Sequence, residues 1–72
     1  MHNNMWKLVI IMCALGNPCV IMEESPMKHY QNYNDCMVVA EAKHTELLEA
    51  FQEYGYWVEN SEFKCENPND LL

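Results

Sequence analysis

The feature that most constrains this chain is an apolar run of eight residues, W-K-L-V-I-I-M-C, at Trp6–Cys13. Apart from Lys7, the run is apolar without alternation, and its centre is rich in β-branched residues. Strands that are covered on both faces have this pattern, whereas a strand with one face in water alternates. We therefore expect residues 6–13 to form the central strand of a sheet, covered on both faces.

The residues after this run predict a β-hairpin. The turn-forming sequence G-N-P at residues 16–18 is followed by a short apolar segment, C-V-I-M-E, at residues 19–23. Two strands joined by such a turn form a hairpin. The next sequence, E-S-P, ends the second strand, and M-K-H-Y-Q-N-Y at residues 27–33 predicts a surface loop.

A single long helix is predicted next, because residues 35–54 contain no Gly or Pro. Asn32 or Asn34 can cap its start, and Gly55 suits the left-handed position after its end. Asp35 falls in the first turn, where a carboxylate interacts favourably with the helix dipole. Apolar residues at helical spacing form the side expected to face the sheet: Cys36, Val39, Ala40, Leu47, Leu48, Phe51 and Tyr54.

The last part of the chain predicts a third strand within residues 56–66. Its sequence E-F-K-C-E alternates, which places Phe63 and Cys65 inward and the charged residues outward. If this strand is interrupted, Asn60–Ser61 is the expected place.

These elements follow the order β-β-α-β in a chain of 72 residues, which is the size of one small domain. The hairpin makes the first two strands antiparallel, and the helix returns the chain so that the third strand runs parallel to the second. A right-handed crossover then places the first strand in the middle, in the order 2-1-3. The expected fold is one α+β domain over residues 1–72, with one long helix packed on one face of a three-stranded sheet. Residues 1–4 and 68–72 are expected to fray.

This topology places the four cysteines in two pairs. Cys13 ends the first strand and Cys19 begins the second, so the two face each other across the hairpin loop. Cys36 at the helix start and Cys65 near the end of the third strand lie at the opposite end of the sheet. We therefore predict the disulfides 13–19 and 36–65, although four cysteines allow three connectivities. A reduced, cytosolic form with buried thiols is the alternative, so the compartment stays open.

The cysteine-bearing segments allow two other interpretations. A zinc-binding module fits less well, because all-thiolate sites commonly use pairs spaced C-x₂₋₄-C, whereas this chain has C-x₅-C and two distant cysteines. Residues 1–16 also resemble a signal peptide, with Lys7 before an apolar segment and A-L-G as the cleavage site, but cleavage there would leave an odd number of cysteines. The apolar run is too short to span a bilayer. We expect no metal site, no cofactor and no membrane span.

The charge of the chain limits its partners. It has a net charge of −7, with four lysines and no arginine. Such a chain is repelled by phosphate backbones and anionic lipids, so we expect no direct binding to nucleic acid. A basic partner protein, such as a nucleic-acid-binding protein, would be attracted. The simpler interpretation is that the charge serves solubility.

Two groups of residues are candidates for contact with a partner: the acidic row Glu46, Glu49 and Glu53, and the aromatic group Tyr54, Tyr56 and Trp57. Closely spaced carboxylates can imitate phosphates, and aromatic residues with a polar atom often anchor interfaces. Further carboxylates would extend the row into a negative face: Glu59, Glu62, Glu66 and Asp70. The alternatives are a solvated helix face for the row and core packing for at least one aromatic residue.

No catalytic site is predicted. His2, His29 and His44 are scattered, and no nucleophile, zinc-protease or phosphate-loop motif occurs. His44 is expected to be half-buried on the helix, beside Ala40 and Leu48.

Several short features together resemble a group of known proteins. M-W-K-L-V-I-I-M-C, the P-C pair, a cysteine at a helix start, G-Y-x-V and F-K-C-x-N-P are similar to short uncharacterised proteins of bacteriophage and prophage genomes. The resemblance spans roughly residues 5–68 and implies a phage accessory protein that binds and inhibits a host protein, without catalytic residues. The acidic helix and the lead-in Met1–Asn4 depart from the pattern.

The expected function is therefore non-enzymatic: a small acidic protein that binds or inhibits another protein. The alternative is a disulfide-stapled exported or envelope-associated structural protein. The oligomeric state is left open.

Overall fold

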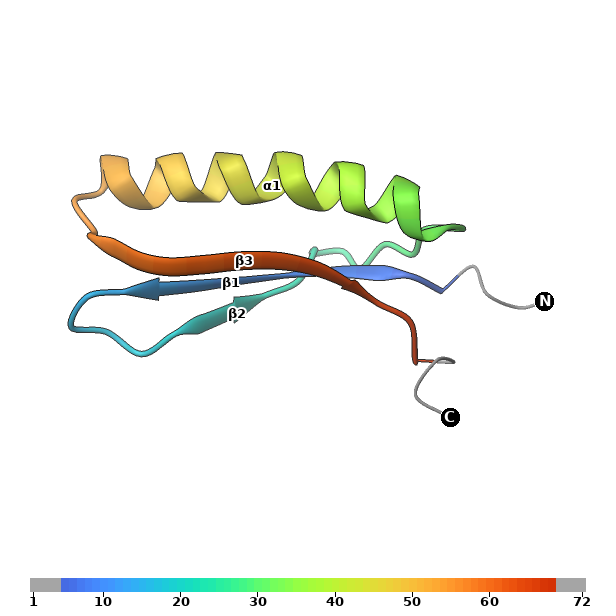
Figure 1. The fold of residues 1–72 in the computed structure, drawn as a ribbon, viewed down its shortest axis with the longest axis horizontal. Helices are drawn as coiled ribbons and strands as arrows, with labels where there is room; N and C mark the ends of the chain where they lie inside the picture. Colours follow the sequence, from blue (N-terminus) through green and yellow to red (C-terminus); the bar gives the residue numbers. More distant parts are fainter. Residues whose placement is uncertain (1–4, 69–72) are drawn as a thin grey trace.

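The computed structural model describes residues 5–68, which form a three-stranded sheet with one helix. The elements are β1 (Lys7–Ala14), β2 (Val20–Met22), α1 (Tyr33–Glu53) and β3 (Val58–Glu66). Figure 1 shows α1 lying lengthwise over one side of the sheet. The predicted α+β class and element order are confirmed. The expected fraying of residues 1–4 and 68–72 falls, apart from Pro68, outside the described residues.

The sheet has the order β2-β1-β3, and β1 is antiparallel to both of its neighbours. Ile11 at its centre pairs with Ile21 of β2 and with Glu62 of β3. β2 and β3 therefore run parallel to each other. The predicted topology is confirmed.

The strand ends differ slightly from the prediction. β1 starts and ends one residue later than expected, β2 is only three residues long, and β3 begins at Val58. β3 runs unbroken through residues 60–61. The register instead shifts between Cys13 and Ala14 of β1, which leaves Glu59 as an extra residue in β3. A bulge of this kind bends the strand that carries it.

Among the described residues, another layer covers only one face of β1, so the expectation of two covered faces is wrong. Leu8, Ile10 and Met12 point toward α1 and are buried. Val9 alternates with them and points to the other face, on which no described element is stacked. It is still buried, and its partner on β3 is Lys64. The long stem of a lysine can cover apolar surface in this way.

The hydrophobic core lies between β1 and the first half of α1. Its buried residues are Leu8, Ile10, Met12, Cys36 and Ala40. Partly buried residues pack around them: Trp6, Met22, Tyr30, Val39, Leu47, Leu48, Phe51, Val58, Phe63 and Cys65. A core of this size contributes little stability by itself, so the covalent links between the elements matter.

α1 begins and ends at the predicted signals. Of the two expected capping residues, Asn32 takes this role, and its Oδ1 accepts a hydrogen bond from the backbone N–H of Asp35 at 2.8 Å. Gly55 follows the helix with a φ of 89°, in the left-handed region. Tyr54, expected on the side facing the sheet, is instead exposed. It is the C-cap residue, where the chain already leaves the helix.

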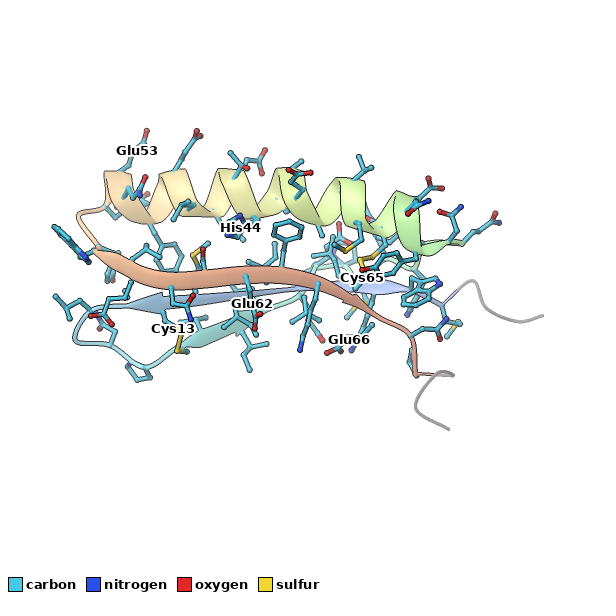
Figure 2. The ribbon with its side chains drawn as sticks, viewed as in Figure 1. Cys13, His44, Glu53, Glu62, Cys65 and Glu66 are labelled. Carbon is cyan, nitrogen blue, oxygen red and sulfur yellow. A yellow bond between two sulfur atoms is a disulfide. The ribbon has the colours of Figure 1, made fainter. Side chains whose placement is uncertain are left out.

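Both predicted disulfides are confirmed. Cys13–Cys19 closes the hairpin loop, and Cys36–Cys65 joins the first turn of α1 to β3. No cysteine is free. Figure 2 shows Cys13 and Cys65 toward opposite ends of the sheet. One link therefore fixes the hairpin and the other fixes the helix on the sheet.

We expect the two disulfides to differ in their effect on stability. Cys36 and Cys65 are separated by 29 residues in sequence, and Cys13 and Cys19 by 6. In the chain-entropy model, the first disulfide adds about 3.6 kcal/mol to the free energy of unfolding and the second adds about 2.4 kcal/mol. In urea unfolding, the free energy of unfolding should therefore fall further for the C36A/C65A variant than for C13A/C19A. A larger loss for the hairpin pair would contradict this account.

Candidate functional site

The predicted acidic row lies on α1, on the side away from the sheet. Glu46, Glu49 and Glu53 are all exposed, and Figure 2 shows Glu53 pointing away from the strands. Within residues 5–68, none of the three forms an ion pair. Unpaired carboxylates in a row attract cationic surfaces.

The other carboxylates do not extend this row. Glu62 and Glu66 lie on β3, and Figure 2 shows them on the side of the sheet opposite α1. Glu66 lies 3.3 Å from the ammonium of Lys64, and Asp70 is outside the described residues. The expectation of a single negative face is therefore wrong, because the acidic residues of α1 and of β3 lie on opposite sides of the molecule.

The three predicted aromatic residues lie at one end of the molecule, where α1 turns into β3. The exposed fractions are 84% for Tyr54, 47% for Tyr56 and 73% for Trp57. None of the three is buried in the core. Tyr56 comes nearest, because its ring lies 5.4 Å from that of Phe51, centroid to centroid.

Leu15, which the sequence did not single out, completes this end of the molecule. Its backbone N–H donates to the carbonyl of Trp57 at 2.8 Å, which fixes the β1–β2 loop beside the α1–β3 turn. Its side chain is 59% exposed. No local signal marks Leu15, because it reaches the aromatic residues only through the pairing of β1 with β3. We call Leu15, Tyr54, Tyr56 and Trp57 the aromatic tip.

The aromatic tip has a negative electrostatic environment. It lies at the C-terminal end of α1, where the helix dipole is negative, and the last turn contains no basic residue. Glu53 and Glu59, both exposed, precede and follow the aromatic residues in sequence. Aromatic faces themselves attract cations. The tip therefore combines apolar contact area with attraction for Lys or Arg side chains.

His44 makes a contact that the sequence did not predict. It is half-buried as expected, but its Nε2 lies 2.7 Å from the Oγ of Ser61 on β3, and its ring packs on Phe63. A serine bonded to an imidazole is one part of a nucleophile–base arrangement. Here both groups are half-buried between helix and sheet. The pair therefore acts as a polar link between α1 and β3.

The segment predicted as a surface loop is anchored at Tyr30. Its backbone exchanges two hydrogen bonds with Trp6, and its hydroxyl lies 3.0 Å from both carboxylate oxygens of Glu24. Burial, and then the bond to Glu24, raises the pKa of Tyr30. On the opposite face of the sheet, the Lys7 ammonium donates to Glu23 at 2.8 Å, and this bond raises the pKa of Lys7.

The described residues offer no cluster of metal ligands. All four cysteine sulfurs are held in disulfides, so none is available as a thiolate. Within residues 5–68, no three His, Cys, Asp or Glu side chains gather as a metal site requires. In the same range, no helix has the length and apolar character needed to cross a membrane.

Comparison with known proteins gives no match: no family model, no curated protein and no solved structure matches this chain. The resemblance to bacteriophage and prophage proteins therefore stays a prediction. A proposal about function therefore rests on the surfaces of the molecule. Among the surfaces, the aromatic tip stands out by its exposed aromatic side chains.

We expect the link between His44 and Ser61 to contribute to stability. Ser61→Ala would leave the imidazole nitrogen half-buried without a partner, so the free energy of unfolding should fall by about 1 kcal/mol. Ser61→Thr is the matched control, because it keeps the hydroxyl and suits a strand. Urea unfolding of both variants measures the effect. If Ser61→Ala is as stable as the wild type, the hydrogen bond makes no net contribution.

The raised pKa of Tyr30 predicts a loss of stability at alkaline pH. Because the folded protein holds this proton more tightly, the stabilisation is complete below the ordinary pKa of 10.0 and is lost as the pH rises from there through the raised pKa. The stability difference between wild type and Tyr30→Phe should therefore be smaller at about pH 11 than at about pH 8 in urea unfolding. The raised pKa of Lys7 acts equally in both proteins. An unchanged difference would show that the hydroxyl of Tyr30 is not perturbed.

Proposed function

We propose that this chain is a non-enzymatic binding protein that occupies or inhibits another protein, and that the aromatic tip is its main contact surface. The exposure of Trp57 and Tyr54 is the observation that carries this proposal. Aromatic residues dominate the hot spots of protein interfaces, and grouped apolar side chains on a surface mark interaction sites.

The aromatic tip is also held in place before binding. The Cys13–Cys19 disulfide closes the loop that contains Leu15, and the hydrogen bond from Leu15 to Trp57 joins this loop to the α1–β3 turn. A surface that is already ordered loses less conformational entropy on binding. This supports a contact surface rather than a frayed end.

The charge of the molecule supports a basic partner. The net charge is −7, the acidic row on α1 is unpaired within the described residues, and the aromatic tip lies at the negative end of the helix dipole. A nucleic-acid-binding protein has the complementary surface. In this proposal, Glu46, Glu49 and Glu53 attract the partner and the aromatic tip anchors it.

The resemblance to bacteriophage and prophage proteins supports a host protein as the target. A small acidic protein that covers a basic surface would inhibit its target by excluding the natural ligand. No chemical step is needed for this activity, which agrees with the expectation that the chain is not an enzyme.

A disulfide-stapled exported or envelope-associated structural protein is the second candidate. Two disulfides in a small domain are typical of oxidising compartments. They fit a binding protein equally well, because both need a stable scaffold. A saturable partner distinguishes the two candidates.

Trp57→Ala tests the aromatic tip. Because the side chain is largely exposed, the substitution should change the free energy of unfolding by less than about 0.5 kcal/mol. The immobilised wild-type protein should capture a partner from host lysate. The Trp57→Ala variant should bind this partner about 30-fold more weakly or worse, as for an interface hot spot. Val38→Ala is the matched control, because Val38 is an exposed apolar residue on α1, away from the aromatic tip.

Salt dependence separates the roles of the two groups. Binding should weaken as salt rises, and E46Q/E49Q/E53Q should reduce that dependence, because screening acts on exposed charges. Retention of the partner by Trp57→Ala would contradict the role of the tip. Absence of any saturable partner would leave the structural protein as the better candidate.

A further inference from the structure

Two hollows lie on the helix side of the sheet, between α1 and β2, and we call them together the groove. α1 packs mainly on β1 and β3, so β2 is left open on this side. The groove contains two hollows, of about 280 Å³ and about 270 Å³. Alternate residues of β1 line them: Leu8 and Ile10 in the first, Met12 and Ala14 in the second.

α1 forms one wall of this groove, and β2 with the loops before and after it forms the other. Met22 lines the first hollow and Val20 the second. α1 contributes three residues spaced four apart, which lie on one side of the helix: Lys43, Leu47 and Phe51. Tyr56 also lines the second hollow, so the groove is continuous with the aromatic tip.

The charged groups of the first hollow are unequally paired. Of its two acidic residues, Glu23 bonds through its carboxylate to Lys7 on the opposite face of the sheet, and Glu24 accepts a hydrogen bond from the hydroxyl of Tyr30. Lys28 and Lys43 line the same hollow, and their ammonium groups form no ion pair or hydrogen bond within residues 5–68. Two lysines whose ammonium groups are unpaired within the described residues therefore line the hollow beside its apolar floor, in a chain whose net charge is −7.

The outer edge of β2 has no strand partner in the described structure. β2 pairs with β1 only, so the backbone groups on its other side are available. The outer edge of the sheet at β3 is rich in charged side chains, which discourage the addition of another strand. β2 has the uncharged sequence Val20–Met22, and its central residue, Ile21, is 69% exposed.

We propose that the groove binds an extended segment of a partner protein, added as an antiparallel strand at the edge of β2. Main-chain hydrogen bonds would give affinity in this mode, and hollows for alternate side chains would give specificity. Alternate residues of a strand are about 6.6 Å apart and share a face. Val20 and Met22 have this spacing, one beside each hollow, so two alternate side chains of the added strand meet the two hollows.

The chemistry of the hollows defines the segment. A Glu side chain in the first hollow lays its methylene groups on Leu8 and Ile10 and places its carboxylate near Lys28 and Lys43. A large apolar side chain fills the second hollow. In an antiparallel strand, the residue beside Met22 comes before the residue beside Val20. The recognised sequence is therefore Glu, any residue, then a large apolar residue.

A second copy of this chain fits the groove less well. Each copy carries a charge of −7, so two copies repel each other. The carboxylates next to β2, Glu23 and Glu24, are already bonded within their own copy. The segment therefore comes from a different protein. The inference rests on the proposed function, since it names one type of segment that the partner would carry.

The test uses the intact protein labelled with ¹⁵N and two blocked hexapeptides of equal composition, T-V-E-T-L-T and T-V-L-T-E-T. The first peptide should shift the amide signals of Val20–Met22, Lys43, Leu47 and Phe51. The second should bind about tenfold more weakly, because its acidic and apolar residues are exchanged between the hollows. Equal binding of the two peptides, or no shifts in β2, would overturn the proposal.

A charge exchange tests the lysines. Lys43 is exposed on α1, and Lys43→Glu should weaken binding of the first peptide by about tenfold. The peptide T-V-K-T-L-T should restore binding to this variant, which general damage to the fold would not permit. Lys64→Glu is the matched control, because Lys64 lies on the opposite face of the sheet, and it should leave binding unchanged. An effect of Lys64→Glu equal to that of Lys43→Glu would overturn the role of the groove.

N-methylation of the peptide tests strand addition. Methyl groups on the amides of Glu and Leu block one edge of the added strand, and methyl groups on Val and the following Thr block the other edge. One of these peptides should lose binding and the other should keep it, because only one edge faces β2. If both bind equally, the segment does not pair with β2.

These experiments do not use the natural partner, so their failure is distinguishable from failure of the proposed function. Loss of the partner in Trp57→Ala together with no peptide binding would remove the groove proposal alone. Dimerisation of the free protein through β2, seen by sedimentation, would also overturn it, because the edge would then be occupied by a second copy.

Discussion

The burial of one face of β1 beneath α1 is the interaction on which the rest of the structure depends. Leu8, Ile10 and Met12 form most of the core on the sheet side, and β1 pairs with both other strands. The Cys36–Cys65 disulfide closes the same interface at the start of the helix. β1 therefore positions the helix, the hairpin and the last strand at once. Both proposed binding surfaces depend on it, because each is built from segments that meet only through β1.

A single helix cannot cover a three-stranded sheet, and the exposed apolar surfaces follow from this limit. A helix with its side chains is about 10 Å wide, whereas neighbouring strands are about 4.8 Å apart. α1 therefore covers β1 and β3 and leaves β2 beside an open groove. A larger domain would bury such a groove under a second helix. Here the two disulfides stabilise a fold whose apolar surface is only partly covered, and this leaves surface for binding.

The topology and both disulfides could be predicted from the sequence, because the signals were local and independent. The apolar run identified the central strand, and Asn32 and Gly55 marked the two ends of the helix. The errors arose where a pattern depends on the surroundings. The run in β1 suggested two covered faces, but Val9 is buried with no described element stacked on its face and with Lys64 as its partner on β3. Tyr54 had core spacing but lies one residue beyond the helix, where that spacing no longer applies.

By itself, the sequence determined the order of the elements, the central place of the first strand and the pairing of the cysteines. Only the tertiary structure brought Leu15 to Trp57 and His44 to Ser61. Only it left the ammonium groups of Lys28 and Lys43 without a partner among the described residues. Propensity and periodicity act over a few neighbouring residues, whereas these contacts depend on strand register and on which strands the helix covers. Both are fixed by side-chain packing between segments that are distant in the chain.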